Sequence, residues 1–216
     1  KIIPRLLFTN KLLFASPEDW CKGKLIIRHI IWFILIIKNF FYIIFLISFS
    51  LNSQDLDIIY PEKSIGLKNW NIVNDDVMGG ISSSNLSLNQ DDNLLFNGNL
   101  SLANNGGFAS TRMRLDQDLN GIKAVKIKFK GDGNTYKLRF QQYNMRASYS
   151  SDFKSVKDEW AEVVLPIKDF VPSWRGYSYS NYPELDIEKI YSLGLQISDK
   201  QEGEFQLEIE YIKGLY

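Results

Sequence analysis

The chain has 216 residues, with 25 basic and 25 acidic side chains, which is enough for one domain of ordinary size and an appendage. This balanced charge argues against a surface for nucleic acid. The only cysteine and the only histidine, Cys21 and His29, lie near the N-terminus. Residues 54–216 therefore lack the side chains for Ser-His-Asp or Cys-His catalysis, for disulfides and for zinc sites built on His or Cys.

The first part of the chain differs in character from the rest. Residues 1–53 carry seven basic and two acidic side chains, whereas residues 54–216 carry 18 basic and 23 acidic ones, a formal charge of −5. Within the first part, Ile30–Leu51 is mostly apolar and is interrupted by Lys38 and Asn39. This pattern predicts an N-terminal hydrophobic helical segment.

Two interpretations of this segment stay open. As one span, it is long enough to cross a bilayer as a membrane anchor. As two parts, Lys38-Asn39 precedes Phe40–Phe49, the ten-residue hydrophobic region of a secretory signal peptide that ends near Ser53. In that case we expect residues 1–36 to be upstream translated sequence or an error of the gene model. Both interpretations place the acidic domain outside the cytoplasm, exported to a periplasm or the extracellular space, or anchored in a membrane through this segment alone.

Residues 54–69 are polar and irregular, which predicts a linker and a first edge segment. Beyond them, residues 70–216 show short stretches of period-two alternation between turn signals. These predicted strands are Asn93–Leu102, Lys123–Lys130, Thr135–Tyr143, Trp160–Leu165, Leu193–Ser198 and Gly203–Ile212. Helical signal is scarce, and we expect only one or two turns over Asp186–Tyr191, capped by Asp186. The pattern predicts an all-β sandwich or jelly roll.

Three finer expectations follow from the alternation. The turn Gly131-Asp132-Gly133-Asn134 predicts a hairpin between the strands that flank it. The last strand should bury Phe205, Leu207, Ile209 and Tyr211. The outward row Lys126, Lys128 and Lys130 should face an acidic row that includes Glu208 and Glu210, because opposite charges favour neighbouring strands.

Two motifs carry a family resemblance. The first is Asn74-Asp75-Asp76-Val77-Met78-Gly79-Gly80, and the second is Asn104-Asn105-Gly106-Gly107-Phe108-Ala109-Ser110. With the later Gly131-Asp132-Gly133 and Trp174-Arg175-Gly176, they make the chain resemble the complex I intermediate-associated protein 30 family from about Trp70 to Tyr216. The resemblance implies a galactose-binding-like jelly-roll β-sandwich. It also implies a non-catalytic assembly factor that binds another protein.

Asp75 and Asp76 are candidate site residues. Their simplest role is an Asx-type turn that leads into the glycine turn. The alternative is a cation site, with calcium as the only cofactor we consider, because two carboxylates converge where the backbone turns. Under the structural interpretation, we expect Asp76 to contribute more stability than Asp75.

The remaining candidates are Arg112, Arg139, Tyr143, Trp174 and Arg175. Arg112 lies on one predicted strand, and Arg139 and Tyr143 lie on one face of another. Planar guanidinium groups beside Tyr and Gln suit carboxylates or sugar hydroxyls. The alternative is a solvated, salt-bridged sheet face. Trp174 suits stacking on a sugar ring or packing within a loop.

Three functions compete for this chain. The first is a non-enzymatic assembly-factor domain that acts by protein–protein interaction. The second is a carbohydrate-binding module of an exported bacterial protein. The third, a carboxylate-based hydrolase, comes last because no acid/base pair at a useful separation is identifiable. We therefore expect a protein partner first and a carbohydrate second, and no enzymatic activity.

Overall fold

The structure is a computed structural model that describes residues 55–60 and 66–216. The expected N-terminal helical segment, its signal peptide or anchor and its upstream residues lie outside the described residues. Within the described ranges, no helix is long and apolar enough to span a bilayer.

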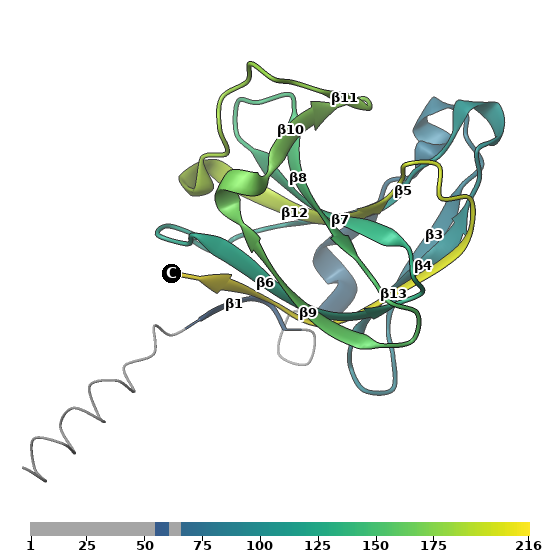
Figure 1. Cartoon of the computed structure of the whole chain (residues 1–216), viewed down its shortest axis with the longest axis horizontal. Helices are drawn as coiled ribbons and strands as arrows, with labels where there is room; N and C mark the ends of the chain where they lie inside the picture. Colours follow the sequence, from purple (N-terminus) through teal and green to yellow (C-terminus); the bar gives the residue numbers. More distant parts are fainter. Residues whose placement is uncertain (1–54, 61–65) are drawn as a thin grey trace, which may run out of the picture. The chain divides into compact units, whose positions relative to one another are not determined.

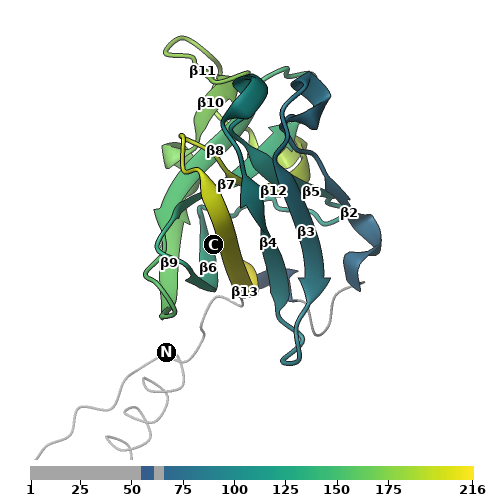
Figure 2. The same cartoon turned by 90° about the vertical axis from the view of Figure 1, so that its right-hand side faces the viewer.

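Two antiparallel sheets form a β-sandwich (Figures 1 and 2). The first sheet has the order β3 (Ser83–Leu88), β4 (Leu94–Leu100), β13 (Gly203–Leu215), β6 (Ala124–Gly131) and β9 (Trp160–Pro166), with β1 (Leu56–Ile59) paired to β13. The second has the order β11 (Tyr177–Ser178), β10 (Val171–Trp174), β8 (Ser148–Lys154), β7 (Thr135–Gln142), β12 (Ile190–Ile197), β5 (Ala109–Arg114) and β2 (Trp70–Ile72). The predicted all-β jelly-roll sandwich is confirmed.

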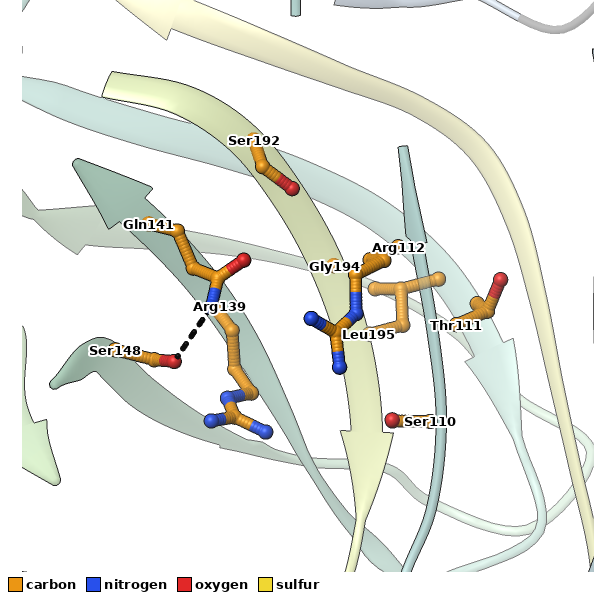
Figure 3. Close-up of a pocket in the computed structure, with 9 residues that line it drawn as sticks. All are labelled: Ser110, Thr111, Arg112, Arg139, Gln141, Ser148, Ser192, Gly194 and Leu195. Carbon is orange, nitrogen blue, oxygen red and sulfur yellow. Dashed lines mark hydrogen bonds between the residues drawn. The ribbon is translucent and has the colours of Figure 1, made fainter. Parts of the chain in front are cut away.

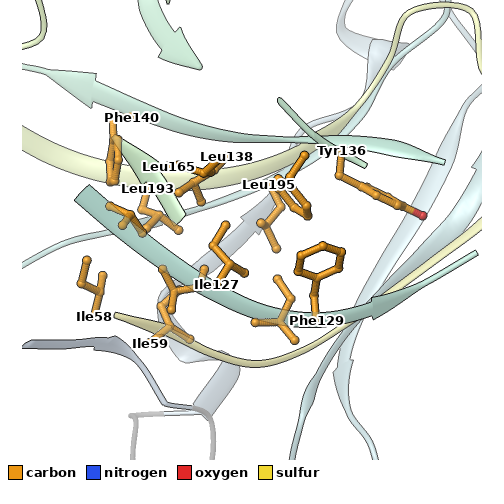
Figure 4. Packing of buried hydrophobic residues seen from close by; sticks show 14 of the residues in the cluster. Ile58, Ile59, Ile127, Phe129, Tyr136, Leu138, Phe140, Leu165, Leu193 and Leu195 are labelled. Carbon is orange, nitrogen blue, oxygen red and sulfur yellow. The ribbon is translucent and has the colours of Figure 1, made fainter. Parts of the chain in front are cut away.

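Alternate side chains of the strands fill the space between the two sheets (Figure 4). From the first sheet, β6 contributes Val125, Ile127 and Phe129, and from the second, β7 contributes Tyr136, Leu138 and Phe140, all essentially inaccessible to solvent. Each such side chain stabilises the fold by about 1.5–3 kcal/mol through removal of apolar surface from water. Strand alternation therefore predicted the core correctly for these elements.

Helical turns in the described residues are short 3₁₀ segments: η2 (Gly66–Asn69), η3 (Asp75–Met78), η4 (Ala103–Asn105), η5 (Ile167–Asp169) and η6 (Ile187–Lys189). The expected cap of the last one is confirmed, because the Asp186 carboxylate accepts a hydrogen bond from the Glu188 N–H. Within the predicted edge segment, β1 places Ile58 and Ile59 in the core. The first sheet therefore includes residues on the N-terminal side of Trp70.

The predicted charge rows do face each other on β6 and β13. Lys130 pairs with Glu208 at 2.8 Å, and Lys128 pairs with Glu210 at 2.7 Å. The third lysine, Lys126, lies 3.4 Å from Asp55. The expectation of facing basic and acidic rows is confirmed.

The predicted hairpin around Gly131–Asn134 is wrong. β6 pairs with β13 and β9, whereas β7 pairs with β12 and β8, so the turn crosses from one sheet to the other. Asp132 supports this crossing by accepting hydrogen bonds from the Tyr136 hydroxyl at 2.9 Å and the Gln206 N–H at 2.7 Å. Both strands alternate in the same way because they bury their apolar faces in one core from opposite sides.

The expected burial of Tyr211 is also wrong. The register of β13 against β6 shifts between Ile209 and Tyr211, as at a β-bulge. Ile212 then takes the buried position, and the Tyr211 hydroxyl donates to Glu162 on the outer face. One extra residue thus moves the rest of the strand to the opposite alternation.

Candidate functional site

Asp75, in η3, is the centre of a hydrogen-bonded hub. Its side chain is fully buried. One carboxylate oxygen accepts from the Ser82 N–H at 2.9 Å; the other accepts from the Ser82 hydroxyl at 2.6 Å, the Gly107 N–H at 2.6 Å and the Phe108 N–H at 3.3 Å. Burial raises the pKa of this carboxyl, but these hydrogen bonds outweigh burial and hold the pKa below its ordinary value. Asp75 is therefore a charged structural residue.

Two glycines leave the space that this carboxylate occupies. A Cβ on Gly80 would lie 2.3 Å from the Asp75 Cγ, and a Cβ on Gly106 would lie 2.5 Å from its Oδ2. One glycine belongs to each of the two motifs that carry the family resemblance. The two motifs are therefore one structural unit, in which the second loop binds the carboxylate of the first.

Asn74 extends the hub to two strands. Its side-chain oxygen accepts from the Ser84 hydroxyl of β3 at 2.8 Å and from the Ser110 N–H of β5 at 3.3 Å. The hub fixes η3 at the edge of both sheets. Beyond it, Val77 and Met78 remain exposed, at 67% and 56%.

Asp76 does not share the role of Asp75. Its side chain is exposed, and it forms no hydrogen bond or ion pair within the described ranges. η3 thus turns Asp75 inward and leaves Asp76 in solvent, which favours the opposite order of stability to the one expected from the sequence. One of the two carboxylates is thus buried and the other exposed, and no cluster of three or more His, Cys, Asp or Glu side chains occurs among the described residues.

A groove of about 1090 Å³ lies on the outer face of the seven-stranded sheet. Its floor consists of side chains of β5, β12, β7 and β8. One wall includes Val77 and Met78 of η3, and the other includes Trp174 at the end of β10 and Arg175, which follows it. Figure 1 shows β10 and β11 at the top of the view, and the segment with η3 (blue) on the right.

Arg112 and Arg139 lie on the groove floor. Both pair in register with Gly194 of β12, Arg112 from β5 and Arg139 from β7. Arg139 donates to the Gln196 side-chain oxygen at 2.7 Å. Burial lowers the pKa of Arg139 to about 10, and the positive charge of Arg112 contributes to the same shift.

Trp174 lies among cationic groups on the groove wall. The guanidinium of Arg175 lies 4.7 Å from the centroid of its ring, and that of Arg146 lies 5.1 Å from the same point. Such cation–π contacts typically contribute about 0.5–1 kcal/mol at exposed positions.

Tyr143 lies beyond the groove. It is half exposed, its hydroxyl accepts from Arg114 at 3.4 Å, and its ring lies 4.7 Å from that of Tyr191. Among the candidates, the structure thus gathers Arg112, Arg139, Trp174 and Arg175 in the groove and leaves Tyr143 and Asp76 outside it. Sequence reasoning missed Gly194, whose signal was a glycine inside an otherwise apolar central strand.

A family model, complex I intermediate-associated protein 30 (CIA30), matches residues 59–209. The chain belongs to this family. It is 29% identical over 106 residues to the mitochondrial complex I intermediate-associated protein 30 of mouse (Mus musculus), an alignment that covers 46% of this chain and 32% of the relative. The chain therefore spans about a third of the curated relative that it matches.

Solved structures share the sandwich at low sequence identity. The family 11 carbohydrate-binding module of the Clostridium thermocellum cellulase Lic26A-Cel5E has a TM-score of 0.55 at 14% identity, over 75% of this chain and 93% of the module. Its counterpart in complex with a β-1,3-1,4-mixed-linked tetrasaccharide has a TM-score of 0.56 at 13% identity, over 76% and 97%. An agarase has a TM-score of 0.52 at 11% identity, over 75% and 24%. At these identities the likeness establishes the fold.

Proposed function

We propose that this CIA30 domain is a non-enzymatic binding domain of the assembly-factor type, which holds a protein partner in the groove. The observation that carries the proposal is the hub at Asp75. It fixes η3 by four hydrogen bonds and so presents the exposed apolar side chains of Val77 and Met78 at the groove wall. Exposed apolar side chains beside a polar groove favour contact with another protein.

The family supports the same function. The mouse relative is named for its association with an intermediate of complex I, which implies action by contact with other proteins. In the groove, Asp152 and Asp199 both pair with Lys137, at 2.8 and 2.7 Å, so these carboxylates stabilise a sheet face instead of forming an acid/base pair. We propose that the domain works outside the cytoplasm, exported or anchored through its N-terminal segment.

Site-specific cross-linking tests this function. A photo-reactive residue replaces Val77 on the groove wall, and a matched protein carries it at Val164, which is similarly apolar and exposed on the other sheet. We expect a defined protein from the native cell to cross-link to position 77 and not to position 164. Equal cross-linking at both positions, or at neither, would contradict a partner in the groove.

Carbohydrate binding is the second candidate. The observation that favours it is the polar groove floor on a sandwich shared with carbohydrate-binding modules. A glycan-array screen of the protein and its Trp174→Ala variant tests this function. Saturable binding of a glycan that the variant loses would favour a module of an exported bacterial protein over a protein-binding domain.

A further inference from the structure

The groove carries positive charge although the domain around it is acidic. Residues 54–216 have a formal charge of −5. Six basic side chains line the groove, namely Arg112, Lys137, Arg139, Arg146, Arg175 and Lys200, against the three acidic ones Asp152, Asp169 and Asp199. Two of these carboxylates are paired with Lys137. The uncompensated charge therefore belongs mainly to arginines.

Arg112 and Arg139 lie next to each other on the floor without a carboxylate between them. Gly194 separates their strands and has no side chain to separate the two guanidinium groups; a Cβ there would lie 2.7 Å from the Thr111 carbonyl oxygen. Figure 3 shows the Arg112 guanidinium in front of the strand that carries Gly194, with the Arg139 side chain on the neighbouring strand. Within the described part of the chain, neither guanidinium group forms an ion pair, and the Arg112 side chain forms no hydrogen bond.

A small hollow of about 30 Å³ lies beside these two groups. The serines Ser110, Ser148 and Ser192 also line it, so hydroxyl donors accompany the guanidinium donors. Two like charges held together are unfavourable unless an anion joins them. Guanidinium groups form their strongest hydrogen bonds with planar carboxylates.

We propose that Arg112 and Arg139 form a binding site for a carboxylate, carried by an acidic segment of the protein partner. This inference rests on the proposed function, because the segment would lie in the same groove. A peptide suits the site better than an acidic sugar for two reasons. The wall side chains Val77 and Met78 are aliphatic, and the ring of Trp174 is already in contact with two guanidinium groups.

Calorimetric titration of the full chain with a hexaglutamate peptide tests the proposal. We expect saturable binding that weakens as NaCl is added, because salt screens charge–charge attraction. Hexaglutamine, which has the same shape without the charge, should not bind. The Arg112→Gln variant should bind hexaglutamate about tenfold more weakly or worse, the loss expected for a charged hydrogen bond.

Two further variants serve as controls. Arg114→Gln removes the same charge two residues along β5, from an exposed side chain that pairs with Asp116 outside the groove, and should change the affinity less than about twofold. Arg112→Lys keeps the charge but loses the planar fork and should give an intermediate affinity. Because the Arg112 side chain makes no hydrogen bond or ion pair with the residues that the structure describes, thermal melts of its variants should match that of the parent.

Several results would overturn the proposal. These are no binding of hexaglutamate, an equal loss in the Arg114→Gln variant, or binding of polygalacturonate without hexaglutamate, which would assign the site to acidic glycans. If hexaglutamate fails while the cross-link at position 77 persists, the carboxylate site is wrong and the protein-binding function stands. If both fail, the protein-binding function fails as well.

Discussion

Asp75 illustrates how one side chain holds two distant loops in place. Its carboxylate accepts four hydrogen bonds, three of them from backbone N–H groups that would otherwise be unpaired beside a buried turn. The carboxylate remains ionised because these hydrogen bonds offset the effect of burial on its pKa. The sequence identified the Asp-Asp pair but not which member is structural, because the donors come from Ser82 and Gly107, on segments that only the fold brings together.

Replacement of Asp75 should be strongly destabilising. Asp75→Ala leaves several buried donors unpaired, and each hydrogen bond to a charged group contributes about 1.5–3 kcal/mol. We expect a loss of about 3 kcal/mol or more in the free energy of unfolding, measured by urea denaturation. Asp76→Ala is the matched control, and its exposed side chain predicts a change within about 0.5 kcal/mol. Similar losses of unfolding free energy in the two variants would contradict this structural role of Asp75.

Acid should reduce the contribution of Asp75 to stability. Its pKa in the folded state is lower than in the unfolded chain, so its contribution is fully present above the ordinary value of 3.8. The contribution is then lost as the pH falls through the lower, folded-state pKa. We expect the gap in unfolding free energy between the parent and Asp75→Asn to be constant from pH 7 to about 5 and to shrink below about pH 4. A gap that stays unchanged down to pH 2 would contradict this assignment.

At the scale of the elements, the alternation along each strand predicted which side chains are buried but not which strands pair. The inward residues of β4, β6 and β7 follow from period two, and the apolar character of Leu193–Ser198 predicted β12 as a central strand. Pairing does not, because β6 and β7 bury the same pattern whether they form a hairpin or face each other across the core. The bulge after Ile209 was equally unpredictable, since Tyr211 and Ile212 both suit a buried position.

The charge ladder between β6 and β13 is unequal along its length. Glu208 is 4% exposed, whereas Glu210 is about one-third exposed. Burial raises the pKa of Glu208, but Lys130 and the amides of Asn93 and Asn89 hold it below the ordinary value. The buried rung therefore depends on its partners more than the exposed rung does.

Removal of each lysine in turn tests this difference. Lys130→Met leaves the buried Glu208 carboxylate without its cation and should cost about 1–3 kcal/mol in the free energy of unfolding. Lys128→Met, at the more exposed rung, should cost less than about 1 kcal/mol. Urea denaturation of the two variants at neutral pH measures both values. A larger cost for Lys128→Met would mean that burial does not govern this ladder.

At the scale of the whole molecule, the groove is a product of topology. Arg112 and Arg139 are neighbours because β12 inserts between β5 and β7, a pairing that brings together three separate parts of the chain. The sequence placed each arginine on an outward face of its strand. It could not show that the two faces adjoin, nor that Gly194 leaves the space between them open. The face on which each arginine lies could therefore be predicted from the sequence. Their adjacency could not, because it depends on the order of strands that are far apart in the chain.

The sandwich as a whole should keep its stability without residues 1–53 but lose much of it without β1. Ile58 and Ile59 are almost completely buried in the core, and β1 pairs with the end of β13. A chain shortened to residues 54–216 should therefore melt cooperatively.

A chain shortened to residues 70–216 should lose about 3–6 kcal/mol in the free energy of unfolding, because two large apolar side chains each contribute about 1.5–3 kcal/mol. Since the free energy of unfolding of a small domain is only about 5–15 kcal/mol, this second chain should melt at a much lower temperature or fail to fold. Circular dichroism melts of both chains measure the difference, and equal melting temperatures would show that β1 is an appendage and not part of the core.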